Sequence, residues 1–270
     1  MERDAAFDAV AAGYDQEFTD TATGRLQRTQ VYQHIKTLVQ NPDFQNIIEI
    51  NCGTGADALW LAQQGKQVLA TDISPQMVAQ VEQKREQLAP DQQALLKTQC
   101  LSATQLKENL STTQPYDLLL SNFGGLNCLS PEELQNFLTD AAAIVRPGGC
   151  LALVIMGRFC WWESLYFLLK GKLKTAVRRL QKEPVSAQLD ENTFVKTWYY
   201  SPKWVSTRAG DFEQIALHPI GFWLPPSYLD PFFKRRDSLL RRLNWLEQKT
   251  GGWSPLAYGA DHYLLVLQRS

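Results

Sequence analysis

Between residues 46 and 156, short apolar segments alternate with segments long enough to form helices. The helical segments lie around residues 55–64, 75–88 and 131–145. The apolar segments, which we interpret as strands, read NIIEI, QVLATD, ALLKTQC, YDLLLSN and CLALVIM. Strands separated by helices predict βαβ units and a parallel sheet that is buried on both faces. This alternation indicates an α/β fold.

The same patterns divide the chain into four parts. We expect residues 1–45 to form helices and residues 46–156 to form the core of the sheet. We interpret residues 157–200 as a helical, aromatic insertion after the fifth strand, and residues 201–270 as a helix and strands that complete the same sheet. The insertion is also basic, which leaves two hypotheses open: a helix on a membrane surface, or a helix packed on the core with a solvated basic face.

Composition limits the compartment and the partners. With 270 residues and a formal net charge of −1, the chain has the size of one large α/β domain, and its charge argues against a nucleic-acid partner. Its five cysteines are scattered, without a CxxC pair, which favours free thiols in a reducing compartment. We see no secretory signal and no apolar run of roughly 18 residues. We therefore expect a cytoplasmic protein without a transmembrane segment.

The segment EINCGTG joins the first strand of the core to its first helix. Gly53 and Gly55 would leave backbone N–H groups open to a ligand, and Asp72 ends the next strand beside them, where a carboxylate can hold a ribose diol. Together with Ala58 these glycines also satisfy the loose dinucleotide pattern, so a nicotinamide cofactor is one possibility. Glu49 favours a cationic or amine-bearing ligand instead, because a carboxylate would repel a diphosphate.

EINCGTG resembles the first motif of the class I S-adenosylmethionine-dependent methyltransferases, in which an acidic and an apolar residue precede alternating glycines. Asn51 stands in the place of the first glycine, and Asn tolerates the left-handed backbone of such a turn. The segments FDAVAAGYD, LATDIS, YDLLLSNFGGLN and RPGG resemble other parts of the family, so the resemblance covers nearly the whole chain. It implies a Rossmann-like fold with a seven-stranded, mostly parallel sheet whose last strand is antiparallel. It also implies an N-terminal helical lid and S-adenosyl-L-methionine as cofactor.

The resemblance assigns roles to individual residues. Asp72 would hold the ribose, Ile73 and Met77 would flank the adenine, and Tyr14 would close over the methionine end. Ser102 stands where many relatives have an Asp near the adenine amino group. The full set of predicted cofactor-binding residues is Tyr14, Arg28, Glu49, Asn51, Cys52, Gly53, Gly55, Asp72, Ile73, Met77, Ser102, Ala103 and Asn122.

Methyl transfer from a sulfonium depends on alignment and on exclusion of water more than on acid–base groups. The candidate catalytic residues are Tyr14, Asn122 and His218, and the chain has no metal-ligand motif. We expect Trp161 and Trp162 to cover, together with the N-terminal helix, a pocket for an apolar or aromatic small molecule. Two other functions stay open: a nicotinamide-dependent oxidoreductase, and a protein that binds S-adenosylmethionine without turnover.

Overall fold

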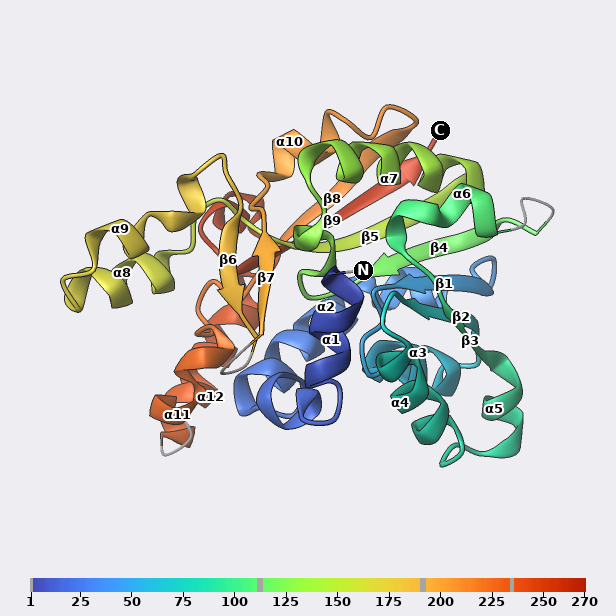
Figure 1. Ribbon diagram of the computed structural model, residues 1–270, viewed down its shortest axis with the longest axis horizontal. Helices are drawn as coiled ribbons and strands as arrows, with labels where there is room; N and C mark the ends of the chain where they lie inside the picture. Colours follow the sequence, from blue (N-terminus) through green and yellow to red (C-terminus); the bar gives the residue numbers. More distant parts are fainter. Residues whose placement is uncertain (1, 111–113, 190–192, 234–235) are drawn as a thin grey trace.

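A seven-stranded sheet forms the centre of the fold in a computed structural model, which describes residues 2–110, 114–189, 193–233 and 236–270 (Figure 1). The strand order is β3-β2-β1-β4-β5-β9-β8. The strands are β1 (Asn46–Ile50), β2 (Gln67–Asp72), β3 (Leu96–Cys100), β4 (Tyr116–Ser121), β5 (Val145–Met156), β8 (Phe212–Ile220) and β9 (His262–Arg269). Strands β1 to β5 pair in parallel, whereas β9 pairs antiparallel with both β5 and β8. The predicted sheet, with its antiparallel last strand, is confirmed.

Helices cover both faces of this sheet (Figure 1). Helices α2, α3 and α4 pack on one face, and α6, α7 and α10 pack on the other. The helices of the sheet domain are α1 (Glu2–Val10), α2 (Ala22–Gln40), α3 (Ala56–Gln63), α4 (Pro75–Arg85), α5 (Pro90–Leu95), α6 (Leu106–Asn109), α7 (Pro131–Ile144) and α10 (Pro202–Ser206). A π-helix, Asp15–Thr19, lies between α1 and α2.

The apolar strands supply both hydrophobic cores. Successive side chains of a strand point to opposite faces, so Ile47 packs with α2 and α3 while Ile48 packs against α7. In β4, Leu118 and Leu119 divide in the same way, and all four side chains are fully buried. Burial of both faces explains why these strands read as continuous apolar runs.

Local signals fix where two of the covering helices begin. Ser74 caps α4 by accepting a hydrogen bond from the backbone N–H of Met77. Ser130 caps α7 in a capping box with Glu133, and each helix has a proline in its first turn. These caps satisfy N–H groups that would otherwise lack partners at the helix start.

The segment after β5 differs from its predicted form. It contains α8 (Trp161–Leu169) and α9 (Leu173–Ala176), but also a hairpin of β6 (Val185–Gln188) and β7 (Phe194–Thr197) that forms a separate two-stranded sheet. The segment predicted as a helical, aromatic insertion therefore also contains a two-stranded sheet.

The part predicted as a helix and strands, residues 201–270, contains two further helices. They are α11 (Asp230–Phe233) and α12 (Asp237–Thr250), and residues 234–235 between them lie outside the described residues. Within the described part of the chain, no helix has the length and apolar character needed to cross a membrane.

The side chain of Asp117 ties together the starts of three neighbouring strands. Its Oδ2 accepts hydrogen bonds from the backbone N–H groups of Gln45 and Asn46, both at 2.7 Å. Its Oδ1 accepts from Nε of Arg146 at 2.5 Å. Because Asp117 is only 6 % exposed, these groups have little access to water as an alternative partner.

We predict that Asp117→Asn lowers the free energy of unfolding by about 1.5–3 kcal/mol, because an amide replaces a charged acceptor of two backbone N–H groups. Urea unfolding followed by circular dichroism measures this change. Asp211→Asn, at an exposed position, is the matched control and should leave the midpoint unchanged. Equal midpoints for both variants would contradict the role assigned to Asp117.

Candidate active site

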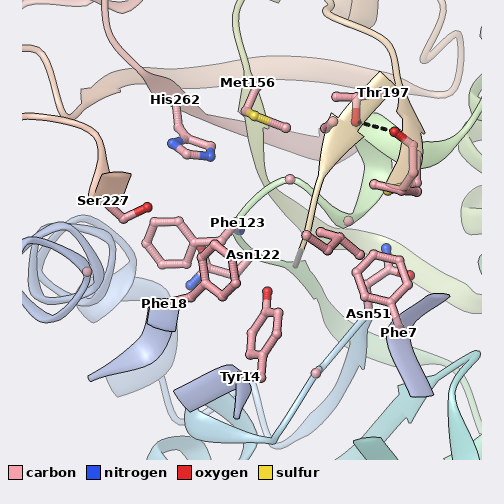
Figure 2. A pocket seen from close by; sticks show the side chains of 18 of the residues that line it. Phe7, Tyr14, Phe18, Asn51, Asn122, Phe123, Met156, Thr197, Ser227 and His262 are labelled. Carbon is pink, nitrogen blue, oxygen red and sulfur yellow. Dashed lines mark hydrogen bonds between the residues drawn. The ribbon is translucent and has the colours of Figure 1, made fainter. Parts of the chain in front are cut away.

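A cavity of about 330 Å³ lies where β1, β2, β4 and β5 end (Figure 2). It extends from Met77 and Ser102 on one side to Met156 and His262 on the other. Ten of the thirteen predicted cofactor-binding residues line it: Tyr14, Arg28, Asn51, Gly53, Asp72, Ile73, Met77, Ser102, Ala103 and Asn122. The predicted strand-end motifs therefore converge on one cavity.

Asp72 joins the loops that follow β1 and β2. Its Oδ2 accepts a hydrogen bond from the backbone N–H of Gly53 and its Oδ1 accepts from that of Ser74, both at 2.9 Å. Burial raises the pKa of Asp72, although these N–H groups favour its charged form. The carboxylate thus lines the cavity in a fixed orientation.

The glycine turn has the left-handed backbone that its sequence predicts. Asn51, Gly53 and Gly55 have φ angles of 59°, 52° and 82°. A side chain at Gly55 would place its Cβ 2.8 Å from the methyl groups of Val81, so glycine is also required there for packing. The Nδ2 atom of Asn51 is buried and, within the described part of the chain, has no hydrogen-bond partner.

Three predicted contacts do not line the cavity. They are Glu49, Cys52 and Gly55, and the side chains of Glu49 and Cys52 are buried, with exposures of 1 % and 7 %. Burial raises the pKa of Glu49 well above its ordinary value, and the nearby carboxylate of Asp57 raises it further. Because Glu49 is buried and does not line the cavity, its charge does not by itself distinguish a cationic ligand from a diphosphate.

Asp57 is a central residue that the sequence analysis missed. It lies in the first turn of α3, and its Oδ2 accepts hydrogen bonds from Nη1 of Arg28 and, at 3.1 Å, from Nδ2 of Asn122. The guanidinium of Arg28 also lies 4.9 Å from the ring centroid of Phe123. An acidic residue in the first turn after a glycine-rich loop is the signal that could have identified it.

The N-terminal segment covers the glycine turn. Figure 2 shows Tyr14 pointing into the cavity beside Phe18, with the two ring centroids 5.0 Å apart. Burial raises the pKa of Tyr14 to about 12. Asp15 holds this segment in place, because its carboxylate accepts hydrogen bonds from Thr54 and Lys84, each at 2.5 Å.

The loop after β4 lies in the middle of the cavity. Phe123 has a φ of 49°, which is strained for a bulky residue, and such strain is typical of functional sites. Asn127 fixes the loop through hydrogen bonds with the backbones of Met156 and Trp198. Beyond the loop, the β6–β7 hairpin contributes the cavity-lining side chains Ala187, Gln188, Val195 and Thr197.

A chain of buried charges ends at the far side of the cavity. Glu163 in α8 pairs with Arg178 at 2.8 Å and with Arg179 at 3.0 Å, and Arg179 pairs with Asp261 at 2.7 Å. The Oδ2 atom of Asp261 lies 3.3 Å from Nδ1 of His262. Burial acts to raise the pKa of Asp261, but His262 and Arg179 together hold it below its ordinary value. Asp261 therefore remains a carboxylate.

His262 is the second functional candidate that the sequence analysis missed. Its ring lies edge-on to Phe123, with a centroid distance of 5.5 Å, and it lines the cavity (Figure 2). Its Nε2 lies 3.8 Å from the position that a Cβ on Gly124 would take. The predicted antiparallel last strand could have indicated His262. Such a strand begins at the edge of the sheet where the parallel strands end, so its first residues lie beside the cavity.

Two expectations about the site are corrected. His218 does not line the cavity: its ring stacks on His34 at 4.0 Å, and its Nδ1 lies 3.0 Å from the carbonyl oxygen of Gly251. Trp161 and Trp162 do not line it either, because their indole N–H groups donate to the backbone carbonyls after β8 and their rings pack together. The insertion instead reaches the cavity through its hairpin and through Glu163, Arg178 and Arg179.

Comparison with known proteins identifies this cavity-bearing core. Residues 47–149 match the family model of the methyltransferase domain. The chain carries a methyltransferase domain. This match confirms the predicted methyltransferase domain and agrees with the predicted class I enzyme and its cofactor, S-adenosylmethionine.

Individual relatives are distant. The chain is 25 % identical over 156 residues to the tRNA 5-carboxymethoxyuridine methyltransferase of Escherichia coli strain K12, and the match spans 56 % of each protein, about half the length of that relative. A putative S-adenosylmethionine-dependent methyltransferase from Listeria monocytogenes superposes with a TM-score of 0.59 at 13 % identity, over 91 % of this chain and 99 % of the other. The glycopeptide N-methyltransferase MtfA, in complex with S-adenosylhomocysteine, gives a TM-score of 0.56 at 12 % identity and 90 % coverage of each chain. These two structures share the fold of this chain.

We predict that Asp72→Ala lowers the affinity for S-adenosylmethionine by roughly ten- to a hundredfold, since charged hydrogen bonds of about 1.5–3 kcal/mol each are lost. Isothermal titration calorimetry measures the affinity, and circular dichroism checks that the variant is folded. Asp91→Ala, at an exposed position, is the control. Unchanged affinity in folded Asp72→Ala would remove Asp72 from the cofactor site.

Proposed function

We propose that this methyltransferase transfers the methyl group of S-adenosylmethionine to a small molecule held between Phe123, Met156 and the β6–β7 hairpin. The observation that carries the proposal is the continuity of the cavity. It runs from Asp72, past Asn122 at the end of β4, to His262. Donor and acceptor can therefore meet in one cavity, where alignment and exclusion of water favour methyl transfer.

The donor side has groups that suit S-adenosylmethionine. Asp72 offers a carboxylate for the ribose hydroxyls, and Met77 and Ile73 offer an apolar surface for the adenine. Asn51 Nδ2 and Arg28 Nε are buried donors without hydrogen-bond partners among the described residues, and both side chains line the cavity. An unsatisfied buried donor is costly, so a bound carboxylate, such as that of the methionine moiety, would stabilise these groups.

The acceptor side favours a small molecule with an apolar or aromatic part. Apolar walls come from Phe123, Met156 and Val195, while Thr197 and Tyr199 contribute hydroxyl groups. A few polar groups in an apolar cavity are typical of small-molecule sites. The tRNA-modifying relative makes a tRNA the alternative acceptor, but the net charge of −1 gives the chain little bulk attraction for RNA.

We assign His262 as the base that receives the acceptor's proton. Asp261 lies against Nδ1, which leaves Nε2 as the nitrogen that faces Gly124 and the acceptor. When bound beside Asn122, S-adenosylmethionine would supply an electrophilic methyl group for transfer to the lone pair of the acceptor. His262 takes the proton released from the acceptor O–H or N–H, and the carboxylate of Asp261 stabilises the resulting imidazolium.

Incubation with methyl-labelled S-adenosylmethionine tests this function. When the protein is supplied with a metabolite extract, we expect label to enter a low-molecular-mass metabolite. When it is supplied with purified tRNA, we expect no label in the tRNA. Label in tRNA alone would favour the alternative acceptor. Tight binding of S-adenosylmethionine, with no labelled product from either source, would favour a protein that binds the cofactor without turnover and would contradict the proposal.

We predict that His262→Ala lowers kcat by roughly 10²–10⁴-fold, as expected for loss of a general base. The affinity for S-adenosylmethionine should remain unchanged, because His262 lies at the acceptor end of the cavity. His218→Ala, a histidine outside the cavity, is the matched control and should retain its kcat. If His262→Ala kept full kcat across the pH range, another group would have to accept the proton.

A further inference from the structure

We infer that residues 164–182, which begin within α8 and include all of α9, dock on an anionic phospholipid surface. In Figure 1 these two helices project from the body of the molecule, away from the seven-stranded sheet. The inference does not rest on the proposed acceptor or on the catalytic role of His262.

Apolar side chains on this segment are exposed to an unusual degree. In α8, Leu165, Leu168 and Leu169 have exposures of 43 %, 50 % and 80 %, and their spacing of three and four residues places them on one helix face. Leu173 at the start of α9 follows with 65 %, and Val177 with 51 %. Contiguous exposed apolar surface of this kind marks an interaction site on a protein in water.

All charged residues of the segment are basic. Residues 164–182 contain no Asp or Glu, although the whole chain has 28 acidic and 27 basic residues. Arg178 and Arg179 are paired with Glu163, but four lysines are exposed: Lys170, Lys172, Lys174 and Lys182. This local excess complements an anionic surface.

The combination of exposed leucines and lysines favours a lipid bilayer over a nucleic acid as the anionic partner. Leucines can enter the boundary between headgroups and acyl chains, while neighbouring lysine stems reach back to the phosphates. A nucleic acid would use the lysines but leave the leucines in water. No helix among the described residues can span the membrane, so the contact is a surface contact.

Hydrogen bonds fix the first turn of α8, which precedes the segment, to the loop after β8. The indole N–H groups of Trp161 and Trp162 donate to the carbonyl oxygens of Phe222 and Trp223. Ser164 Oγ donates to the carbonyl oxygen of Ala176 at 2.8 Å and holds α8 against α9. These contacts give the two tryptophans a structural role in place of the predicted position over the cavity.

Co-sedimentation of the full chain with vesicles tests the inference. We expect at least tenfold more protein bound to vesicles of phosphatidylglycerol and phosphatidylcholine than to vesicles of phosphatidylcholine alone, with the difference lost at high salt. The variant Leu169→Asp/Leu173→Asp should lose tenfold or more of this binding. Ile215→Asp, which changes an aliphatic residue with 49 % exposure on β8, should keep it.

A second pair of variants tests the charge. Lys172→Glu/Lys174→Glu should lose the preference for anionic vesicles, whereas Lys36→Glu/Lys97→Glu, at exposed positions elsewhere, should not. Absence of binding to any vesicle, or equal binding by Leu169→Asp/Leu173→Asp and the unaltered chain, would overturn the inference. So would a dimer, in sedimentation velocity, that Leu169→Asp/Leu173→Asp converts to monomer without any vesicle binding, because a second copy would then cover this face.

Affinity for S-adenosylmethionine separates this test from that of the proposed function. Both pairs of surface variants should bind the cofactor as the unaltered chain does, since α8 and α9 lie outside the donor side of the cavity. Loss of vesicle binding with intact cofactor binding therefore reports on the segment alone.

Discussion

The parallel pairing of β1, β2, β4 and β5 places the candidate functional groups of this protein at one edge of the sheet. Parallel strands end on the same side, so Asn51, Asp72, Asn122 and Met156 meet there although they are far apart in the sequence. β9 runs in the opposite direction and begins at that edge, which brings His262 to the same cavity. The apolar strands thus determine both the core and the position of the chemistry.

Two buried charge networks border the cavity, one at its proposed donor end and one at its proposed acceptor end. On the donor side, Asp57 connects Arg28 in α2 with Asn122 at the end of β4. On the acceptor side, Arg179 connects Glu163 in α8 with Asp261 at the start of β9. Each network has every charge paired, which is the condition under which buried ions are tolerated. Each also fixes a side chain at the cavity wall: Asn122 in the first case and His262 in the second.

Most of the sheet and of the proposed donor side could be predicted from local sequence patterns. The left-handed turn at Asn51 and the position of Asp72 follow from short motifs whose residues lie within one strand–helix–strand unit. The acceptor side could not be predicted in this way. The β6–β7 hairpin and the contact of Trp161 with the carbonyl of Phe222, 61 residues away, depend on tertiary packing rather than on local periodicity. From the sequence we predicted that Trp161 and Trp162 cover the pocket. In the structure their indole N–H groups donate hydrogen bonds to backbone carbonyl oxygens instead.

We propose that one cavity aligns a methyl donor held at Asp72 with an acceptor that faces His262. A crystal structure of the protein with S-adenosylhomocysteine would show whether it does. We predict that the ribose hydroxyls contact the carboxylate of Asp72 and that the sulfur lies beside Asn122, on the side of the cavity that opens toward His262. A sulfur turned away from His262, or a ligand bound outside this cavity, would contradict the account.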